Sequence, residues 1–299
     1  MKILIVGGSG FVSGELARRA VEAGHEVWAV TRGRRPMPQG VHALTADRSD
    51  ATAFRNAVRG AEVRWDFAAD CICYTPADME RDVEVLTGTA SQLLFISTDF
   101  VFDPARRVFP QPEESAHYLS EGYGGQKRAC ELLLARSAPP SLPWTVLRCC
   151  HIYGPGSQLG CLPAHSRDPD LIARLKRGEA LRLVGGGAYL QQPLFVRDLA
   201  DLILSAAGRE SAYGELYNVA GPEIVESRRY YEDIAAELGV RASFEEIPVE
   251  RYRAEHPEHA SFLCHRIYRL DKLERSGLRV PATPLRAGIA AHVRSLLKS

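Results

Sequence analysis

The sequence predicts an α/β protein with a doubly wound parallel sheet and a smaller C-terminal lobe, and three observations carry this prediction. Short β-rich segments alternate with helical patterns through the first half of the chain. A glycine cluster directly follows the first expected strand, and 299 residues suffice for one large domain with an added lobe. Because ligands of such sheets bind at the carboxyl ends of the strands, we expect the functional residues where strands end.

The periodicity of the first half places each element in turn. The expected strands are residues 2–6, 25–31, 41–46, 66–74, 93–97 and 144–150, and the expected helices are 11–23, 51–58, 78–87 and 123–136. In the second half we expect a loop at 154–170, helices at 171–177 and 228–238, and a strand that enters a helix at Asp198. We also expect a strand followed by a turn at 181–188, and strands at 216–223 and 242–249. Residues 1–151, with returning segments at about 188–222, then form the sheet domain, and residues 152–187 and 223–299 form mainly the substrate lobe.

Composition limits the partners and the location. The 37 basic residues balance the 37 acidic ones, which argues against a nucleic-acid partner because phosphate binding needs clustered basic charge. No segment approaches the roughly 20 apolar residues that cross a bilayer, and the start does not resemble a signal peptide. Seven cysteines without framework spacing are typical of reduced thiols. We expect a cytoplasmic protein that acts on a small molecule.

The glycine cluster "GGSG" stands between a strand and a helix, which is where a dinucleotide pyrophosphate binds backbone N–H groups at a helix N-terminus. Gly7 and Gly10 fit the usual G-x-x-G spacing, but Ser13 occupies the place of the third glycine. Its small side chain is compatible with close packing of the helix. The alternative interpretation is a bare strand-to-helix turn.

The second strand discriminates between the two nicotinamide cofactors. NAD sites usually place Asp or Glu there to bind the ribose 2′-hydroxyl, whereas a 2′-phosphate needs cations. This strand ends in Thr31 and Arg32, with Arg34 and Arg35 beyond, and carries no carboxylate at its tip. We therefore favour NADP(H) over NAD(H). The complete set of expected cofactor contacts is Gly7, Gly8, Ser9, Gly10, Phe11, Val12, Thr31, Arg32, Asp47, Arg48, Cys71, Tyr123 and Lys127, with Asp47 and Arg48 near the adenine.

Tyr123 and Lys127 stand four residues apart in an expected helix and so share one face. A phenol with a pKa near 10 is a poor acid or base at neutral pH, and a neighbouring ammonium lowers that pKa because it favours tyrosinate. Upstream, "LLFISTDFVFD" places Thr98 and Asp99 at the carboxyl end of a strand.

Several motifs in order along the chain resemble the extended short-chain dehydrogenase/reductases, the NAD-dependent epimerase/dehydratase family. They are "GGSGF", "ISTDFVFD", the Tyr123 and Lys127 pair, "LRCCHIYGPG", "PLFVRDLAD", "LYNVAGPE" and "RLDKLERSGLRVP". The resemblance implies a Rossmann domain, bound NAD(P) and a homodimer. It also implies that Tyr123 is the acid/base, that Lys127 lowers its pKa and binds the nicotinamide ribose, and that Thr98 donates a hydrogen bond to the substrate oxygen.

Departures from the family pattern bear on the substrate. Phe100 replaces the Glu that dehydratases of the family use, so dehydration is disfavoured. His151 stands where the family has a substrate-binding Asn, and it is interpreted either as a substrate ligand or second acid/base, or as a structural histidine. Gln191 and Gln192 replace the usual pyrophosphate-binding Arg. The expected substrate contacts are Asp99, Phe100, Cys150, His151, Gln191 and Gln192.

Three functions remain open at this point. We favour a ketoreductase that transfers hydride at a secondary alcohol or ketone of a sugar-like molecule, and an epimerase acting by transient oxidation uses the same Thr98, Tyr123 and Lys127. A non-catalytic NADP(H)-binding sensor or RNA-associated protein on the same fold is the third. No metal site is expected, because the adjacent cysteines Cys149 and Cys150 have no standard ligand spacing and are better interpreted as small buried hydrophobes.

Overall fold

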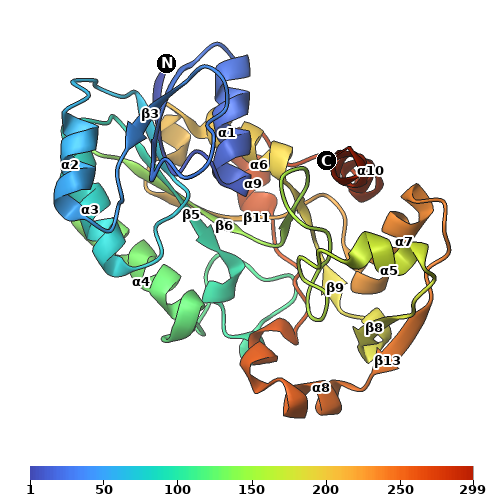
Figure 1. The fold of residues 1–299 in the computed structure, drawn as a ribbon. Coiled ribbons are helices and arrows are strands. Elements are labelled where there is room, and N and C mark those ends of the chain that lie inside the picture. Colours follow the sequence, from blue (N-terminus) through green and yellow to red (C-terminus); the bar gives the residue numbers. More distant parts are fainter. Residues whose placement is uncertain (299) are drawn as a thin grey trace.

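The largest element of the computed structural model, which describes residues 1–298, is a seven-stranded and wholly parallel sheet. Its order is β11-β6-β5-β4-β1-β2-β3 (Figure 1). The strands are β1 (Lys2–Val6), β2 (Glu26–Thr31), β3 (Val41–Thr45), β4 (Phe67–Asp70), β5 (Leu93–Thr98), β6 (Trp144–Cys149) and β11 (Glu215–Val219). The order reverses between β1 and β4, and ligands of doubly wound sheets bind at such a switch point. The predicted Rossmann-type fold is confirmed.

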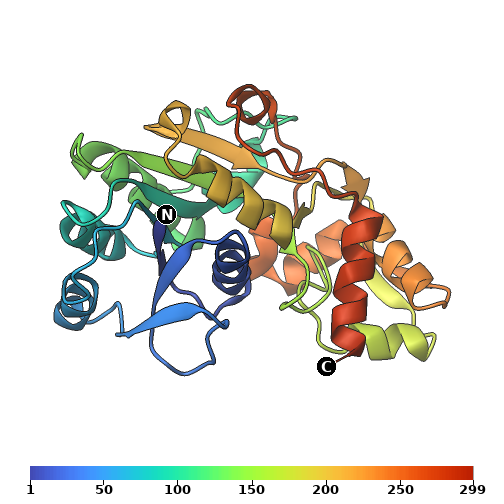
Figure 2. The ribbon, with the colours of Figure 1, turned by 90° about the horizontal axis from the view of Figure 1, so that it is seen from above.

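Helices cover both faces of this sheet (Figures 1 and 2). Helices α1 (Phe11–Glu22) and α6 (Val196–Ala206) pack on one face, and α2 (Ala51–Arg59), α3 (Pro76–Leu86) and α4 (Gly122–Ser137) pack on the other. Alternate residues of β1 serve the two cores: Ile3 and Ile5 face α1 and α6, whereas Leu4 and Val6 face the opposite layer. This two-sided burial explains why the strand is apolar at every residue from Ile3 to Val6.

The C-terminal lobe has its own apolar core, in which Tyr153 and Tyr230 are fully buried. Its helices are α5 (Leu171–Lys176), α7 (Ser227–Glu237), α8 (Val249–Glu255) and α10 (Leu285–Leu297), and its parallel strand pair is β8 (Leu181–Val184) with β13 (Phe244–Ile247). Two short pairs, β7 (Ile152–Tyr153) with β10 (Leu194–Phe195) and β9 (Leu190–Gln191) with β12 (Val225–Glu226), connect the regions. Helix α9 (Asp271–Arg275) returns to the sheet, where Lys272 Nζ donates to the carbonyl of Leu216 at 2.8 Å.

Some expected boundaries differ from those in the structure. The strand expected at 66–74 ends at Asp70, because its carboxylate accepts a hydrogen bond from the Ile72 backbone N–H at 2.6 Å and turns the chain. Thr75 then caps α3, with Pro76 as the first helical residue. Short helical segments at η1 (Asp99–Val101) and η5 (Pro257–Phe262), and helices α8 and α10, were not predicted. Within residues 1–298, no helix is both long and apolar enough to span a membrane.

Candidate active site

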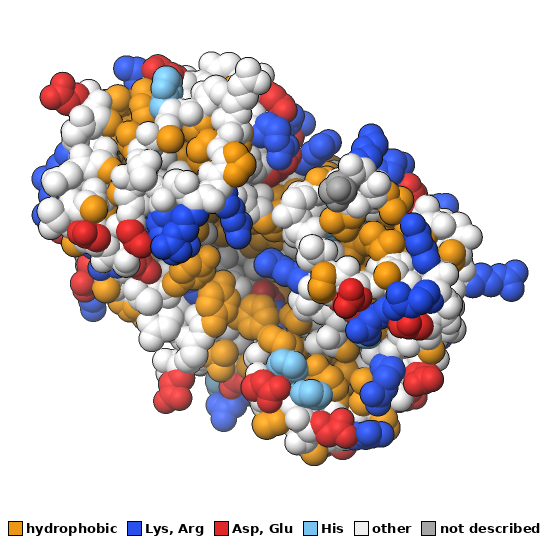
Figure 3. All heavy atoms as spheres, in the orientation of Figure 1, with side chains coloured by type: hydrophobic (Ala, Val, Ile, Leu, Met, Phe, Trp, Pro, Cys, Tyr) orange, Lys and Arg blue, Asp and Glu red, His pale blue; other side chains and the backbone are white. Residues whose placement is uncertain are grey.

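A cleft of about 460 Å³ lies at the carboxyl ends of the central strands. Its walls come from the start of α1, the ends of β4, β5 and β6, helix α4, and two lobe segments at 162–167 and 262–266. The space-filling view shows a hollow between the sheet domain and the lobe, with hydrophobic side chains inside and basic side chains along its border (Figure 3). The cleft therefore combines the edge where the sheet binds ligands with residues from the far half of the chain.

The glycine turn brings the backbone of β1 close to β2 and opens α1 toward the cleft. Gly8 has φ of +107°, and a Cβ placed on it would lie 2.4 Å from Cβ of Ala29, so only glycine fits. Ser13 is buried, and its Oγ accepts from the Gly10 N–H at 3.1 Å, which ties the helix start to the turn. Gly10, Phe11, Val12 and Ser13 line the cleft, and the first N–H groups of a helix have no partner within it. The turn thus forms a cradle suited to a phosphate.

A second cavity of about 280 Å³ adjoins the other side of the glycine turn. Arg18 and Arg35 line it together with Ser9 and Met37. Thr31 is buried at the end of β2, and its Oγ1 accepts from the Gly33 N–H at 3.0 Å, which sends the arginine-rich loop outward. Arg32 and Arg34 are exposed on this loop and do not line the cavity. Of the three arginines in this loop, Arg35 is therefore the one that lines the cavity beside the glycine turn.

Asp47 and Arg48 come just after β3 and lie in different environments. Asp47 is exposed, and hydrogen bonds from Ser49 lower the pKa of its carboxyl, with help from the charges of Arg32 and Arg34. Arg48 points into the protein, where it donates to the carboxylates of Asp70 and Asp82 and to a backbone carbonyl. Because these bonds occupy its guanidinium, the structure does not place the Arg48 side chain at an adenine site.

Thr98, Tyr123 and Lys127, the three expected catalytic residues, all line the cleft. Gly124 lets α4 approach η1, because a Cβ there would lie 2.0 Å from the Phe100 carbonyl oxygen. Tyr123 thereby reaches Thr98, with which it shares a hydrogen bond, and its ring meets that of Phe100 edge-on at 6.1 Å. Lys127 is buried one turn later, and its Nζ donates to the carbonyls of Cys73 and Ile96 at 2.8 and 2.6 Å.

The pKa of Tyr123 differs from the lowered value that its spacing from Lys127 predicts. Desolvation at the cleft raises the pKa of Tyr123 to about 12, and the Thr98 hydrogen bond opposes that rise only in part. Burial also lowers the pKa of the Lys127 ammonium. In the free protein Tyr123 is therefore a neutral phenol at pH 7, which suits a proton donor.

A buried ion cluster forms the floor of the cleft at the end of β5. The Asp99 carboxylate accepts from Arg266 and from the hydroxyl of Tyr268, and Arg107 donates to the Asp99 carbonyl at 2.7 Å. Although burial opposes it, these partners keep the pKa of Asp99 below its ordinary value. Asp99 lines the cleft, but its side chain is committed to these bonds. The guanidinium of Arg266 also covers the ring of Phe100, 4.2 Å from its centroid.

His151 and the adjacent cysteines line the wall at the end of β6. Burial lowers the pKa of His151 to about 4, so its imidazole is neutral at pH 7, and its Nε2 has no hydrogen-bond partner. Cys149 and Cys150 are buried, and burial raises the pKa of both thiols. They are therefore uncharged at neutral pH, as the interpretation of small hydrophobes requires. Cys71 is half-buried at the end of β4 and also lines the cleft.

Gln191 and Gln192 lie outside the residues that line the cleft. Gln192 is buried, and its amide bonds to the Gly221 carbonyl and the Tyr268 backbone N–H, each at 3.0 Å. Gln191 is fully buried in β9, and its amide has no partner. The structure thus turns both side chains away from the substrate space. Instead, Ser166, Arg167, Phe262 and Arg266 enter the cleft from the lobe, and no sequence motif marked them.

The fold and the site together indicate the class of protein. A parallel sheet with a glycine cradle at its switch point, and a Thr, Tyr and Lys group beside it, is the architecture of a dinucleotide-binding short-chain dehydrogenase/reductase. The model of the NAD dependent epimerase/dehydratase family matches residues 3–220, and the chain belongs to this family. The expected NAD(P)-dependent oxidoreductase or epimerase is confirmed at this level.

Individual relatives are more distant. The chain is 26% identical to the chloroplast stem-loop binding protein of 41 kDa b from Arabidopsis thaliana, over 75% of this chain and 60% of that protein. It is 27% identical to 2′-dehydrokanamycin reductase from Streptomyces kanamyceticus, over 88% of this chain and 74% of that protein. Among solved structures, UDP-glucose 4-epimerase from Thermotoga maritima covers 100% of this chain and 99% of its own, with a TM-score of 0.78 at 18% identity. The structural likeness supports the fold.

Proposed function

We propose that this protein is an NADP(H)-preferring ketoreductase of a small, sugar-like ketone. The observation that carries the proposal is the meeting of Thr98 and Tyr123 in the same cleft as the glycine cradle. One of its relatives is named as a reductase, which favours the same reaction.

The residues around the cleft fit a bound nicotinamide dinucleotide. The close packing at Gly8 and the helix start at Gly10 suit a pyrophosphate, and a side chain on either glycine would meet neighbouring atoms. Arg32 and Arg35 are the cations that we assign to a 2′-phosphate, and Lys127 is assigned to the nicotinamide ribose. When bound, this cofactor supplies the hydride.

The chain's own residues supply the proton and the alignment. Tyr123 Oη, neutral because its pKa is about 12, donates a proton to the carbonyl oxygen of the substrate. Thr98 Oγ1 donates a hydrogen bond to that oxygen and holds it beside the phenol. The buried ammonium of Lys127 lies one turn away and stabilises negative charge as it develops on Tyr123.

The remaining walls describe the substrate. Phe100 and Phe262 meet edge-on at 5.8 Å and present an apolar surface that suits the C–H face of a ring. The unpartnered Nε2 of His151 is suited to a substrate hydroxyl. Gln191 is turned inward and Arg266 is neutralised by Asp99, so neither is free to bind a pyrophosphate. These features favour a substrate without a nucleoside diphosphate.

The first test is a fluorescence titration of the protein with NADPH and, separately, with NADH. We expect NADPH to bind at least tenfold more tightly, because a charge-assisted bond to the 2′-phosphate contributes about 1.5–3 kcal/mol. Arg35→Ala should remove most of this preference and Arg32→Ala a smaller part of it, and the neighbouring exposed Arg34→Ala serves as the matched control. Equal binding of the two cofactors in the wild type would contradict the NADP(H) assignment.

The second test separates reduction from its alternatives. With a panel of cyclic ketones, the wild type should consume NADPH, and Tyr123→Phe should lose at least a hundredfold in rate while it still binds cofactor. An epimerase would instead convert stereoisomers without net consumption of NADPH.

RNA binding is the second candidate function, because one relative is named as a stem-loop binding protein. Retention of an RNA stem-loop in a mobility assay, without binding of either cofactor, would favour it. The balanced charge of the chain argues against it.

We also propose a homodimer that associates through the exposed side of α4. Leu132 on this helix is 54% exposed, which is high for a leucine in a packed helix. Light scattering after size exclusion should give twice the chain mass of 33.0 kDa, and Leu132→Glu should reduce it to one chain. A wild-type monomer would contradict this assembly.

A further inference from the structure

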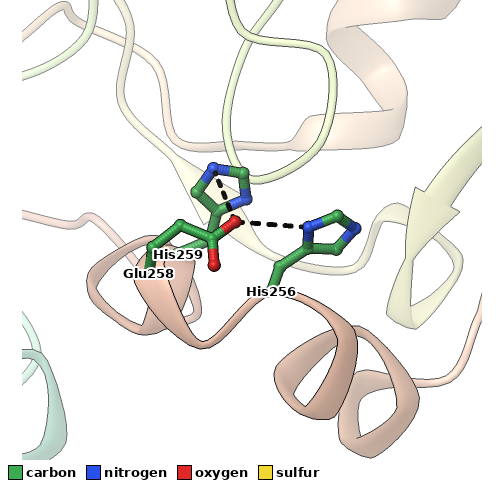
Figure 4. Close-up of side chains that lie close together, drawn as sticks. All are labelled: His256, Glu258 and His259. Carbon is green, nitrogen blue, oxygen red and sulfur yellow. Dashed lines mark hydrogen bonds and ion pairs between the residues drawn. The ribbon is translucent and has the colours of Figure 1, made fainter.

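Two imidazoles and a carboxylate come together where α8 passes into η5, in the sequence "HPEH". His256 Nδ1 lies 3.3 Å from Glu258 Oε1, and His259 Nε2 lies 3.8 Å from the same oxygen. Figure 4 shows both rings directed toward Glu258. One donor atom from each residue lies within 4.8 Å of the other two, so the three donors are close enough to be ligands of one ion.

A hydrogen bond to its other ring nitrogen fixes the orientation of His259. Its Nδ1 lies 2.8 Å from the hydroxyl of Tyr252, and that hydroxyl is 3.3 Å from the carbonyl oxygen of Pro163. Because the carbonyl can only accept, the Tyr252 hydroxyl donates to Pro163 and accepts from His259 Nδ1–H. The proton is thereby placed on Nδ1, and the lone pair of Nε2 points toward Glu258. A partner that holds the second ring nitrogen in this way is the usual companion of a metal-ligating histidine.

We propose that His256, Glu258 and His259 bind a divalent transition metal of the zinc type. Two neutral imidazole nitrogens and one carboxylate oxygen are the ligand set of open zinc sites, in which solvent completes the coordination. Zinc bonds of about 2.0–2.1 Å place neighbouring ligand atoms about 3.3 Å apart, so closure requires only a small movement. The side chains are 42%, 62% and 33% exposed, which leaves them free to make it.

The position of the cluster links the metal to the candidate active site. The ring of His259 stacks on Phe262, with centroids 4.8 Å apart and planes at 22°, and Phe262 forms part of the cleft wall. A metal that holds His259 would therefore also hold η5 in place against the cleft. The other group of converging donors in the described residues, Asp70, Cys73 and Asp82, is buried and already occupied by the guanidinium of Arg48.

The test uses the full chain without an affinity tag, first freed of metal with a chelator. Zn²⁺ is titrated by calorimetry, and Co²⁺ is titrated as a spectroscopic probe of coordination. We expect one metal per chain, and His256→Ala and His259→Ala should each weaken binding at least tenfold. Tyr252→Phe should weaken it about tenfold, because it removes only the group that orients His259. His117→Ala, at an exposed histidine far along the chain, is the matched control.

Circular dichroism of each variant establishes that it is folded before its affinity is compared. The proposal is overturned if the wild type binds Zn²⁺ no more tightly than the folded His256→Ala and His259→Ala double variant, or if His117→Ala weakens binding as much as either single variant. In either case His256 and His259 form only surface ion pairs with Glu258. The titration needs neither cofactor nor substrate, so failure of the proposed ketoreductase function would not affect its outcome.

Discussion

Arg266 donates to the carboxylate of Asp99 across 167 residues of sequence, and this buried pair joins the C-terminal lobe to the end of β5. We predict that Arg266→Ala lowers the free energy of unfolding by about 3 kcal/mol, because removal of one partner leaves a buried charge uncompensated. Arg107 still contacts Asp99 and limits the loss. Urea denaturation measures the change, and the exposed Arg269→Ala is a control expected within about 0.5 kcal/mol of the wild type.

The same pair predicts an acid dependence of stability. The folded pKa of Asp99 is lowered, chiefly by Arg266 against the opposing effect of burial. Its contribution is therefore complete above the ordinary Asp pKa of about 3.9 and is lost as the pH falls toward the lowered folded value. Asp99→Asn should flatten this part of the stability profile, and an unchanged slope below pH 4 would contradict the assignment.

Arg48 is predicted to be a structural residue. It forms ion pairs with Asp70 and Asp82, and both carboxylates are fully buried. Arg48→Ala should lower the free energy of unfolding by about 3–5 kcal/mol, since it leaves these carboxylates without their cation. If the variant instead kept wild-type stability in thermal unfolding and lost NADPH affinity, Arg48 would act at the adenine after all.

Substitution by alanine should affect stability and NADPH affinity differently at two glycines of the turn. At Gly10 a Cβ would meet only Ser13 Oγ at 3.1 Å, a tight contact that a small shift of this side chain relieves, so Gly10→Ala should fold and bind NADPH at least tenfold more weakly. At Gly8, a Cβ would clash with Ala29 at 2.4 Å in a backbone of positive φ. Gly8→Ala should therefore lose more than about 2 kcal/mol of stability. Parallel thermal melts and NADPH titrations distinguish the two effects, and equal melting points would refute the difference.

The raised pKa of Tyr123 predicts the pH dependence of catalysis. Reduction needs the neutral phenol, which persists to the pKa of about 12, so kcat/KM for ketone reduction should be flat between about pH 6 and 9. Oxidation of the alcohol needs the tyrosinate and should rise about tenfold per pH unit over that range. A break near pH 7 in both profiles would show that the bound cofactor lowers this pKa.

Much of the fold could be predicted because its signals are local. The apolar part of β1 (Ile3–Val6), the glycine turn and the α1 pattern follow one another directly in the sequence, and each depends on backbone sterics or two-sided burial. The sequence does not predict helices α8 and α10, because the apolar pattern before α8 is typical of a strand to residue 249 and no motif marks residues 285–297.

Residues of the candidate site could be predicted from the sequence only where they lie at or near the ends of the sheet strands. Thr98 ends β5, His151 comes soon after β6 and Tyr123 lies in the first turn of α4, and the sheet brings them to one edge. Arg167, Phe262 and Arg266 come from lobe segments whose path depends on packing, so nothing in the sequence marked them.

The sequence by itself determined the alternation of strands and helices and the glycine turn between β1 and α1, because these depend on periodicity and on backbone conformations open mainly to glycine. Only the tertiary structure decided which polar side chains are free. It pairs Arg48 and Asp99 inside the protein, turns Gln191 away and leaves the His151 Nε2 without a partner. The physical reason is that a buried charge must find an opposite charge, and which one lies within reach depends on contacts between residues distant in the chain.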